Sequence, residues 1–289
     1  MPYYCEILMQ QLLNKIFIGT MSGTSYDGID VCAMSLDPEI KLLHFASYKY
    51  PKNLRKEIAK VIEHQTLSLQ KYGELDRQIG MAFASAINNF ILQRKIARSQ
   101  ICAVGLSGQT LWHYPQGNYP FSIQAGDAQV IAKTCKIDVV SDFRNDHIKL
   151  GGEGAPLVPE FHQQIFASAK QSRLILNIGG IANYSFLEKS KGFMGSDSGP
   201  GNALLDAYCQ KYLNRPFDKN GLLARKGLMH LSSLNKMLAH PFFKKRSPKS
   251  TGKEVFNLSF IPQALLQQPH ENILATLTEL SAMTIGRSI

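Results

Sequence analysis

Apolar residues alternate or recur at regular spacing along most of the chain, and their pattern predicts strands first and helices after them. A strand-like stretch at 15–20 leads into a glycine- and serine-rich segment at 21–28, and apolar residues resume between 29 and 36. Two strands joined by such a segment indicate a β-hairpin. The pattern then predicts, in order, a strand at 41–50, helices at about 52–64 and 68–96, and a short buried strand at 101–106.

A second round of strands and helices follows in the rest of the chain. It predicts, in order, a strand at 137–141, a helix near 156–169, an apolar strand at 174–178 and a helix over 271–289. Neither sequence repeats nor a flexible linker separate the two rounds. We therefore expect an α/β protein with two lobes, 1–140 and 141–289, which pack against each other with a cleft between them.

The composition is that of a globular protein without a membrane anchor. The chain has 289 residues, of which 44% are hydrophobic, enough for a sizeable core. The stretch 1–18 is broken by polar residues, and no apolar run reaches the roughly 18 residues that a membrane span needs. The five cysteines form no Cys-x-x-Cys pair, and the histidines show no metal-ligand spacing. These features favour the reducing cytoplasm.

The formal net charge of +10 would suit an anionic partner, such as a phosphorylated ligand or a nucleic acid. The basic residues are spread along the chain except for one cluster, Lys244, Lys245, Arg246, Lys249 and Lys253. No nucleic-acid-binding motif accompanies this cluster, so we expect no nucleic-acid partner. The alternative, a basic nucleic-acid binder, would show an affinity that falls steeply with salt.

The segment Gly19 to Asp30 carries the first candidate site. Its glycines allow a tight turn with N–H groups near phosphate oxygens, its hydroxyls add donors, and Asp27 or Asp30 could hold magnesium. A nucleotide phosphate site is one interpretation; an ordinary hairpin turn is the other, because the same residue types dominate turns. The segment is not a Walker loop, since no Gly-Lys-Ser/Thr follows.

Two further polar segments follow predicted strands. The segment 105–115 is expected to be a loop after a buried strand, where α/β proteins place ligand contacts, and Trp112 could stack on a sugar or simply pack. The segment 142–157 combines carboxylates and a histidine with a glycine-rich loop, as a general base, a cation site or an anion site would require. A charged surface turn is the alternative.

The remaining candidate segments are 177–183 and 197–206. The second places Asp197 and a glycine-rich turn at the start of a predicted helix, which suits phosphate or sugar hydroxyls. Helix capping by Ser198 or Asn202 would explain part of this pattern without a ligand.

Taken in order, these segments resemble the anhydro-N-acetylmuramic acid kinase family from about residue 16 to 289. The matching patterns are Gly-x-Met-Ser-Gly-Thr-Ser-x-Asp-Gly-x-Asp, Gly-Gln-Thr-x-x-His-x-Pro, Asp-Phe-Arg, Gly-Gly-x-Gly-Ala-Pro-Leu-Val-Pro, Asn-Ile-Gly-Gly-Ile-Ala-Asn, Gly-Pro-Gly-Asn-x-Leu-Leu-Asp and Pro-Lys-Ser-Thr-Gly-Lys-Glu. The resemblance implies a two-lobed, ribonuclease H-like (actin-like ATPase) fold with ATP and Mg²⁺ in the cleft. It also implies a reaction of cell-wall recycling, in which 1,6-anhydro-N-acetylmuramate is opened by water and phosphorylated to N-acetylmuramate 6-phosphate.

The resemblance also implies roles for individual residues. The ATP phosphates would be held by Gly23, Thr24, Ser25, Tyr26, Asp27, Gly28, Ile29 and Asp30, with Asp27 as the metal ligand. The amino sugar would contact Gln109, Thr110, Gly152, Asp197 and Asn202. Catalysis would fall to His147 and its neighbour Asp146, because the family places its water-activating aspartate at the position of His147.

The chain also departs from the family pattern at two other places. Leu106 and Ser107 stand where the family usually has serine and histidine, and the family continues past the helix at 271–289 with a Gly-Gly-Gly loop that contacts adenosine. We therefore expect an incomplete second lobe whose exposed apolar surface favours a homodimer. Two alternatives to an active kinase follow: an impaired or inactive remnant, and a protein that binds the sugar without turnover.

Overall fold

A computed structural model describes residues 15–23, 26–36, 39–189, 191–252 and 254–289. Thr24, Ser25 and Lys253 lie outside the described residues. The chain divides into two compact units, Met1–Gly154 and Ala155–Ile289. The sequence placed the boundary earlier, at 140/141, but the strand at 139–141 pairs within the first unit, and Arg144 donates a hydrogen bond to the carbonyl of Gly154.

The first unit is built on one mixed sheet. Its strands are β1 (Ile16–Ser22), β2 (Gly28–Ser35), β3 (Lys41–Lys49), β4 (Ile101–Tyr114), β5 (Phe121–Ala125) and β6 (Val139–Ser141). The order is β3-β2-β1-β4-β5, and β6 pairs with β4. The first three strands are antiparallel, whereas β4 runs parallel to both β1 and β6. This is the ribonuclease H-like strand order that the resemblance implied.

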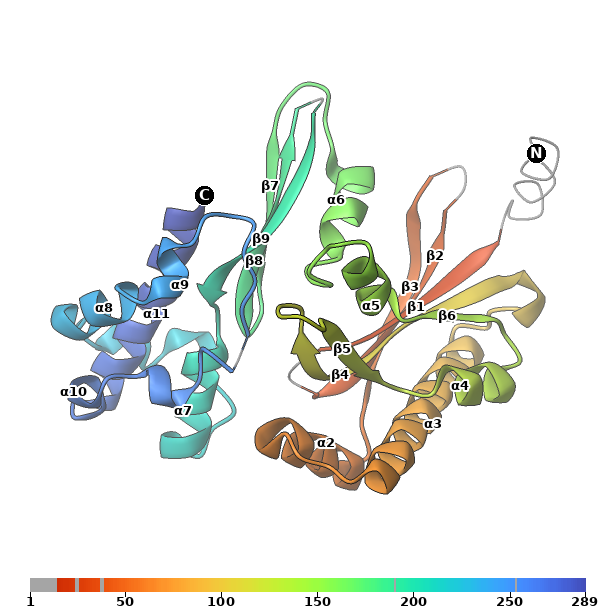
Figure 1. Cartoon of the computed structure of the whole chain (residues 1–289), viewed down its shortest axis with the longest axis horizontal. Coiled ribbons are helices and arrows are strands. Elements are labelled where there is room, and N and C mark those ends of the chain that lie inside the picture. The colour runs from red at the N-terminus through yellow and green to blue at the C-terminus, as the bar shows by residue number, and fades with distance from the viewer. Residues whose placement is uncertain (1–14, 24–25, 37–38, 190, 253) are drawn as a thin grey trace. The chain divides into compact units, whose positions relative to one another are not determined.

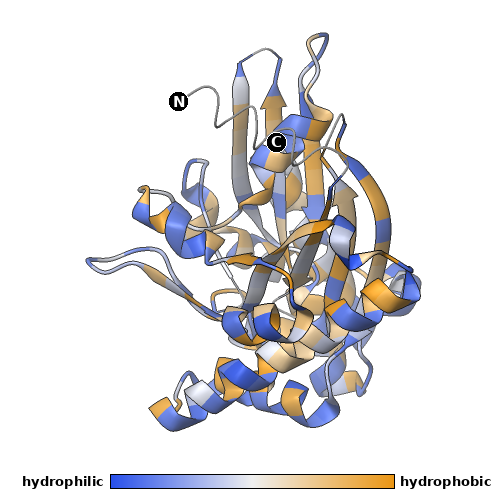
Figure 2. Cartoon of the chain, turned by 90° about the vertical axis from the view of Figure 1, so that its right-hand side faces the viewer, coloured by the Kyte–Doolittle hydropathy of each residue, from blue (hydrophilic) through white to orange (hydrophobic). Residues whose placement is uncertain are grey.

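Helices cover both faces of this sheet. They are α2 (Lys52–His64), α3 (Leu69–Gln93), α4 (Ala128–Cys135), α5 (Phe143–Lys149) and the short 3-10 turn η1 (Arg98–Gln100). Helices α2, α3 and α4 lie on one side and α5 on the other (Figure 1). Ser68 begins α3 by accepting a hydrogen bond from the Lys71 N–H at 3.2 Å. The helices carry hydrophobic and hydrophilic faces (Figure 2), and Phe83 and Phe90 of α3 are fully buried in the core.

The second unit combines a small antiparallel sheet with a group of helices. Its strands are β7 (Arg173–Ile178), β8 (Ile181–Glu188) and β9 (Gly192–Pro200), in that order across the sheet. Its helices are α6 (Val158–Phe166), α7 (Ala203–Leu213), α8 (Leu231–Leu238), α9 (Pro241–Lys244), α10 (Gln263–Leu266) and α11 (His270–Ser288), with 3-10 turns at Lys219–Gly221, Ala224–Lys226 and Leu258–Phe260. Helix α6 packs against the sheet, and α11 packs against α7, α8 and β9. Phe242, Phe256 and Leu277 are buried between these helices.

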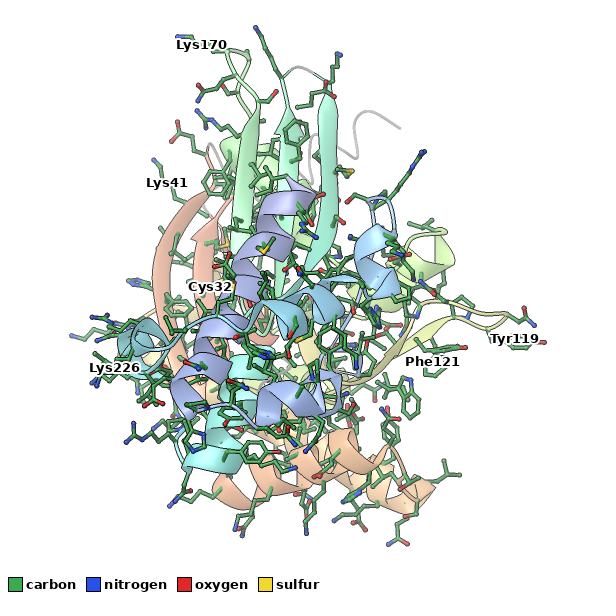
Figure 3. The ribbon with its side chains drawn as sticks, turned by 90° about the vertical axis from the view of Figure 1, so that its left-hand side faces the viewer. Cys32, Lys41, Tyr119, Phe121, Lys170 and Lys226 are labelled. Carbon is green, nitrogen blue, oxygen red and sulfur yellow. The ribbon has the colours of Figure 1, made fainter. Side chains whose placement is uncertain are left out.

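The strands and helices expected from the apolar pattern are all present, but two segments expected as loops are regular structure. Residues 105–114 lie within β4, which runs on to Tyr114 because its second half pairs with β5. The turn of this hairpin carries Tyr119, and Phe121 begins β5 (Figure 3). The segment that begins at Asp142 is helical from Phe143 to Lys149. Among the described residues, no helix has the length and apolar character to cross a membrane.

Candidate active site

Strands β1 and β2 pair as an antiparallel hairpin, and the described residues 19–23 and 26–30 are here called the glycine hairpin. The Tyr26 N–H donates to the Gly23 carbonyl at 3.0 Å, and Tyr26 has a positive φ of 43°. Gly28 faces β3 so closely that a β-carbon would lie 2.8 Å from the Tyr48 carbonyl oxygen. Only glycine fits at this position without moving a strand.

Gln109 of β4 fastens the glycine hairpin to the sheet. Its side chain is fully buried; Oε1 accepts from the Ser22 hydroxyl at 2.7 Å, and Nε2 donates to the carbonyls of Thr110 at 3.1 Å and Gly23 at 3.4 Å. Thr20 adds a bond to the Gly105 carbonyl at 3.0 Å. The structure therefore places this expected sugar contact beneath the hairpin, where it positions the backbone of the proposed phosphate site.

Replacing Gln109 with Met, which keeps the volume but removes the amide, is expected to lower the free energy of unfolding by about 1–3 kcal/mol. The carbonyls of Gly23 and Thr110 lose a donor, and the Ser22 hydroxyl keeps only the Gly28 carbonyl as its acceptor. It is also expected to raise the KM for ATP more than the KM for the sugar. Denaturant unfolding and steady-state kinetics measure both effects. Gln78→Met, at an exposed position of α3, is the matched control. Unchanged stability and KM would rule out the fastening role.

The other expected phosphate-site residues divide between the surface and the core. Asp27 and Asp30 are exposed, Ile29 is buried, and the Tyr26 ring lies 6.0 Å from the Arg55 guanidinium. Within the part of the chain that the structure describes, no three His, Cys, Asp or Glu side chains gather as a metal site. Mg²⁺ bound to a nucleotide needs only one or two protein carboxylates besides the phosphates, and the exposed carboxylates of the hairpin fit that requirement.

Helix α5 carries both candidate catalytic residues and points them in different directions. Asp146 and His147 are consecutive, so their side chains leave the helix about 100° apart. Asp146 is exposed and accepts a hydrogen bond from the Lys149 ammonium at 3.0 Å. The glycine-rich and polar pattern predicted both residues on a loop, where a shift by one residue already misplaces a side chain. On a helix the same shift redirects it.

His147 is held against the glycine-rich turn that follows α5. Its Nδ1 accepts the Gly154 N–H at 3.0 Å, and a β-carbon on Gly152 would collide with Nε2. Because Nδ1 uses its lone pair for this bond, the neutral ring carries its proton on Nε2. In this arrangement the His147 ring can donate from Nε2 but has no lone pair left with which to take a proton. Gly152, an expected sugar contact, lies against this ring.

Polar side chains from β4, β5 and α5 form a connected cluster beside Asp146, here called the α5 cluster. Asn145 accepts from the Ser122 N–H at 2.7 Å and donates to the Ser122 carbonyl and to Asp142. The Ser122 hydroxyl contacts His113 Nδ1 at 3.0 Å and accepts from Gln124, which in turn accepts from Thr110. Ser122 and Gln124 fall outside every sequence motif, so only the pairing of β5 with β4 could reveal them.

Burial and the neighbouring Arg144 charge lower the pKa of His113, against a smaller opposing effect of the Glu153 backbone. Because the folded pKa lies below the unfolded one, the neutral ring contributes stability above about pH 6.5, and this contribution is lost as pH falls below that value. His113→Asn keeps an acceptor near Ser122 but cannot titrate. Its unfolding midpoint is therefore expected to fall less than that of the wild type between pH 7.5 and 5. Parallel curves would contradict this role for His113.

Asp197 of β9 organises the loop at 249–251 in the second unit. Its carboxylate is buried and accepts from the Thr251 N–H at 2.8 Å and from the Ser250 hydroxyl at 3.3 Å, while its own N–H donates to the Lys249 carbonyl. The motifs that contain Asp197 and Ser250 are thus in direct contact although they are more than fifty residues apart in the sequence.

Asn202 belongs to a second glycine turn, at 199–202, which is hydrogen-bonded to the turn between β7 and β8. These hydrogen bonds between the two turns are here called the clasp. The Asn202 and Gly201 N–H groups donate to the carbonyls of Gly179 and Gly180, at 2.8 and 2.9 Å. Asn202 begins α7, but its side chain donates to the Ile178 carbonyl and does not cap the helix. The Ser198 hydroxyl donates to Ala182. Side-chain capping by Ser198 or Asn202, one interpretation of the sequence, is therefore wrong.

Comparison with known proteins identifies the family of the chain. The model of the family described as anhydro-N-acetylmuramic acid kinase matches residues 15–289. The chain belongs to the anhydro-N-acetylmuramic acid kinase family. A family member from Gamma-proteobacterium EBAC31A08 is 50% identical over 96% of this chain and 76% of its own length. The enzyme of that name from Vibrio vulnificus strain YJ016 is 41% identical over 96% of this chain and 75% of its own length.

Solved structures of other kinds resemble the chain only weakly. An ROK hexokinase from Thermus thermophilus matches with a TM-score of 0.31 at 12% identity, covering 94% of this chain and 89% of its own. A PPX-GPPA enzyme of Aquifex aeolicus matches with a TM-score of 0.32 at 10% identity, covering 95% and 93%. For this anhydro-N-acetylmuramic acid kinase family member, the fold therefore rests on the strand order of its own sheet.

Proposed function

We propose that this chain transfers the γ-phosphoryl group of ATP to 1,6-anhydro-N-acetylmuramate and opens its anhydro ring in the same reaction. Water attacks the anomeric carbon and loses a proton, the bond between C1 and the bridging oxygen breaks, and that oxygen at C6 attacks the γ-phosphorus. ADP leaves, and the sugar product is N-acetylmuramate 6-phosphate. A product of this kind belongs to cell-wall recycling in the cytoplasm, where ATP is available.

The observation that supports this proposal best is the glycine hairpin in a chain whose residues 15–289 match the kinase family model. Phosphoryl transfer depends mainly on positioning and on neutralising charge. Ser22 and Gly23, which Gln109 holds by hydrogen bonds, and Gly28, which lies against β3, suit the first requirement. Asp27 would hold Mg²⁺, which would neutralise charge on the ATP phosphates; Asp30 is the alternative carboxylate.

Within the proposed reaction, Asp146 is the better candidate for the base that takes the proton from water. The lone pair on Nδ1 of His147 is occupied by the Gly154 N–H, whereas the exposed Asp146 carboxylate keeps acceptor capacity beside the Lys149 ammonium. His147 then acts as a positioning residue that holds the 151–154 turn. This division of roles replaces the simple substitution of histidine for aspartate that the alignment of motifs suggests.

The sugar contacts are proposed at Thr110, Gly152, Asp197 and Asn202. Thr110 uses its hydroxyl hydrogen for Gln124, so its oxygen would accept from a sugar hydroxyl. The Asn202 amide nitrogen donates to Ile178, and its oxygen would likewise serve as an acceptor. Asp197 and the backbone of Gly152 would complete the set. The expected homodimer and the expected lack of a nucleic-acid partner stay predictions.

A test of the proposed function measures ADP release with Mg²⁺ and ATP, with and without 1,6-anhydro-N-acetylmuramate. Release that depends on the sugar is the expected result. Thermal stabilisation by the sugar without ADP release would contradict the kinase proposal and favour a binding protein without turnover. N-acetylmuramate without the 1,6-anhydro bridge is the control substrate, because it lacks the bond between C1 and the C6 oxygen that the proposed reaction breaks.

A further inference from the structure

The second unit contains a basic hollow of about 430 Å³ near the end of α11. It is lined by Leu238, Phe243, Lys244, Lys245, Arg246, Ser247, Lys249, Thr284, Arg287 and Ser288. A volume of this size falls in the range of small-molecule sites. None of the proposed phosphate, sugar or base residues lines it.

The lining carries five basic side chains and no acidic one. Among the described residues, the ion pairs of the chain involve other lysines, so no intramolecular carboxylate balances these charges. Arg287 also suits the C-terminal end of α11, where the helix dipole favours a positive charge. The other four residues lie outside that helix and need another explanation.

Lys249 is the most informative member of this set. Its side chain belongs to a residue that is only 8% exposed, and its ammonium has a long hydrogen bond of 3.4 Å to the Phe242 carbonyl and lies 4.7 Å from the Phe242 ring centre. Burial, and secondly the charge of Lys245, lower the pKa of Lys249. A buried ammonium beside another cation is costly, and an anion in the hollow would relieve both the burial and the repulsion.

The hydroxyl groups that line the hollow already form hydrogen bonds within the protein, so the basic side chains are the main groups that could bind a ligand. The Thr284 and Ser288 hydroxyls donate to backbone carbonyls of α11, and the Ser247 hydroxyl contacts Tyr184 and Ser196. Phe243 and Leu238 provide an apolar wall. A lining that combines cationic donors with apolar side chains suits a phosphate group attached to a less polar body.

We propose that this basic hollow binds a small phosphate-bearing molecule, such as a nucleotide or a sugar phosphate, through Lys245, Lys249 and Arg287. The proposal is independent of the kinase reaction, since its residues are separate from those assigned to phosphoryl transfer. It assigns a role to the basic side chains at 244–249, which the proposed chemistry does not use.

Isothermal titration of the full chain with inorganic pyrophosphate at low salt tests the proposal. Lys245→Gln/Arg287→Gln is expected to weaken binding at least tenfold, and Lys249→Met, which keeps the buried stem, is expected to weaken it as well. The matched control is Lys219→Gln/Lys236→Gln, which removes two exposed positive charges away from the hollow. Equal weakening in the control, or unchanged binding in both hollow variants, would overturn the proposal.

Parallel titrations with ADP and with glucose 6-phosphate distinguish the two sources of the phosphate group. A nucleotide site would show the charge-dependent loss with ADP, and a sugar-phosphate site with glucose 6-phosphate. Sugar-dependent ADP release is measured on the same variants. If a variant with substitutions in the basic hollow loses pyrophosphate binding but keeps kinase activity, the hollow is a site separate from the kinase active site. Loss of pyrophosphate binding in Gln109→Met alone would assign the anion to the glycine hairpin and overturn the proposal.

Discussion

Replacing Asp146 with Asn is expected to lower kcat by about 10²–10⁴-fold, the usual contribution of a positioned general base. The substitution keeps the shape of the side chain and its position on α5 but removes the charge and the basicity. The exposed ion pair with Lys149 contributes little stability, so the variant should fold normally. The KM for ATP is expected to stay near its wild-type value, because the glycine hairpin is untouched.

Two substitutions at His147 test whether this residue is the general base or a positioning residue. Asn at this position can place its side-chain oxygen near the site of Nδ1 and accept the Gly154 N–H, so His147→Asn is expected to keep most of the activity. His147→Ala removes the acceptor and should lower activity more. A loss in His147→Asn as large as that in Asp146→Asn would contradict the assignment and identify the imidazole as the base.

Replacing Gly201 with Ala is expected to destabilise the second unit by about 1–3 kcal/mol or more. A β-carbon there would collide with the Gly179 carbonyl oxygen, which belongs to a backbone turn and has no rotamer with which to move away. The clasp between the turns at 179–180 and 201–203 would open, and Asn202 would move with it. We therefore expect a lower unfolding midpoint and a higher KM for the sugar.

Gly286→Ala provides the matched control, because it makes the same chemical change within α11 where a β-carbon would meet no neighbour within 4 Å. Alanine is the better helix former by up to about 1 kcal/mol, so this variant should be as stable as the wild type or more so. Equal stability of the Gly201 and Gly286 variants, measured by thermal unfolding, would show that the clasp does not hold the second unit together.

The sequence predicted much of the fold because apolar spacing survives in the structure. The alternation at 29–36 and the helical spacing at 68–96 both reflect side chains that end in the core, such as Ile29, Phe83 and Phe90. The segments 105–115 and 142–149 were predicted as loops because glycine and polar residues are typical of turns. Pairing with β5 and packing against the sheet override that local preference.

The sequence motifs predicted where the candidate sites lie, but the motifs alone could not predict the role of each side chain. Gln109 lies in a polar motif, yet it is buried because the partners that satisfy its amide, Ser22 and Gly23, come from a distant strand. Similarly, the proton position on His147 depends on the Gly154 N–H, a bond that only the turn after α5 creates. Long-range hydrogen bonds of this kind leave no periodic signal in a sequence.

The most direct test of the proposed kinase reaction is mass spectrometry of the sugar after incubation of the full chain with Mg²⁺, ATP and 1,6-anhydro-N-acetylmuramate. We expect a product heavier than the substrate by one water and one phosphoryl group, formed in equal amount to ADP and about 10²–10⁴-fold more slowly with Asp146→Asn. A folded wild-type chain that leaves the anhydro sugar unchanged would contradict the proposed function.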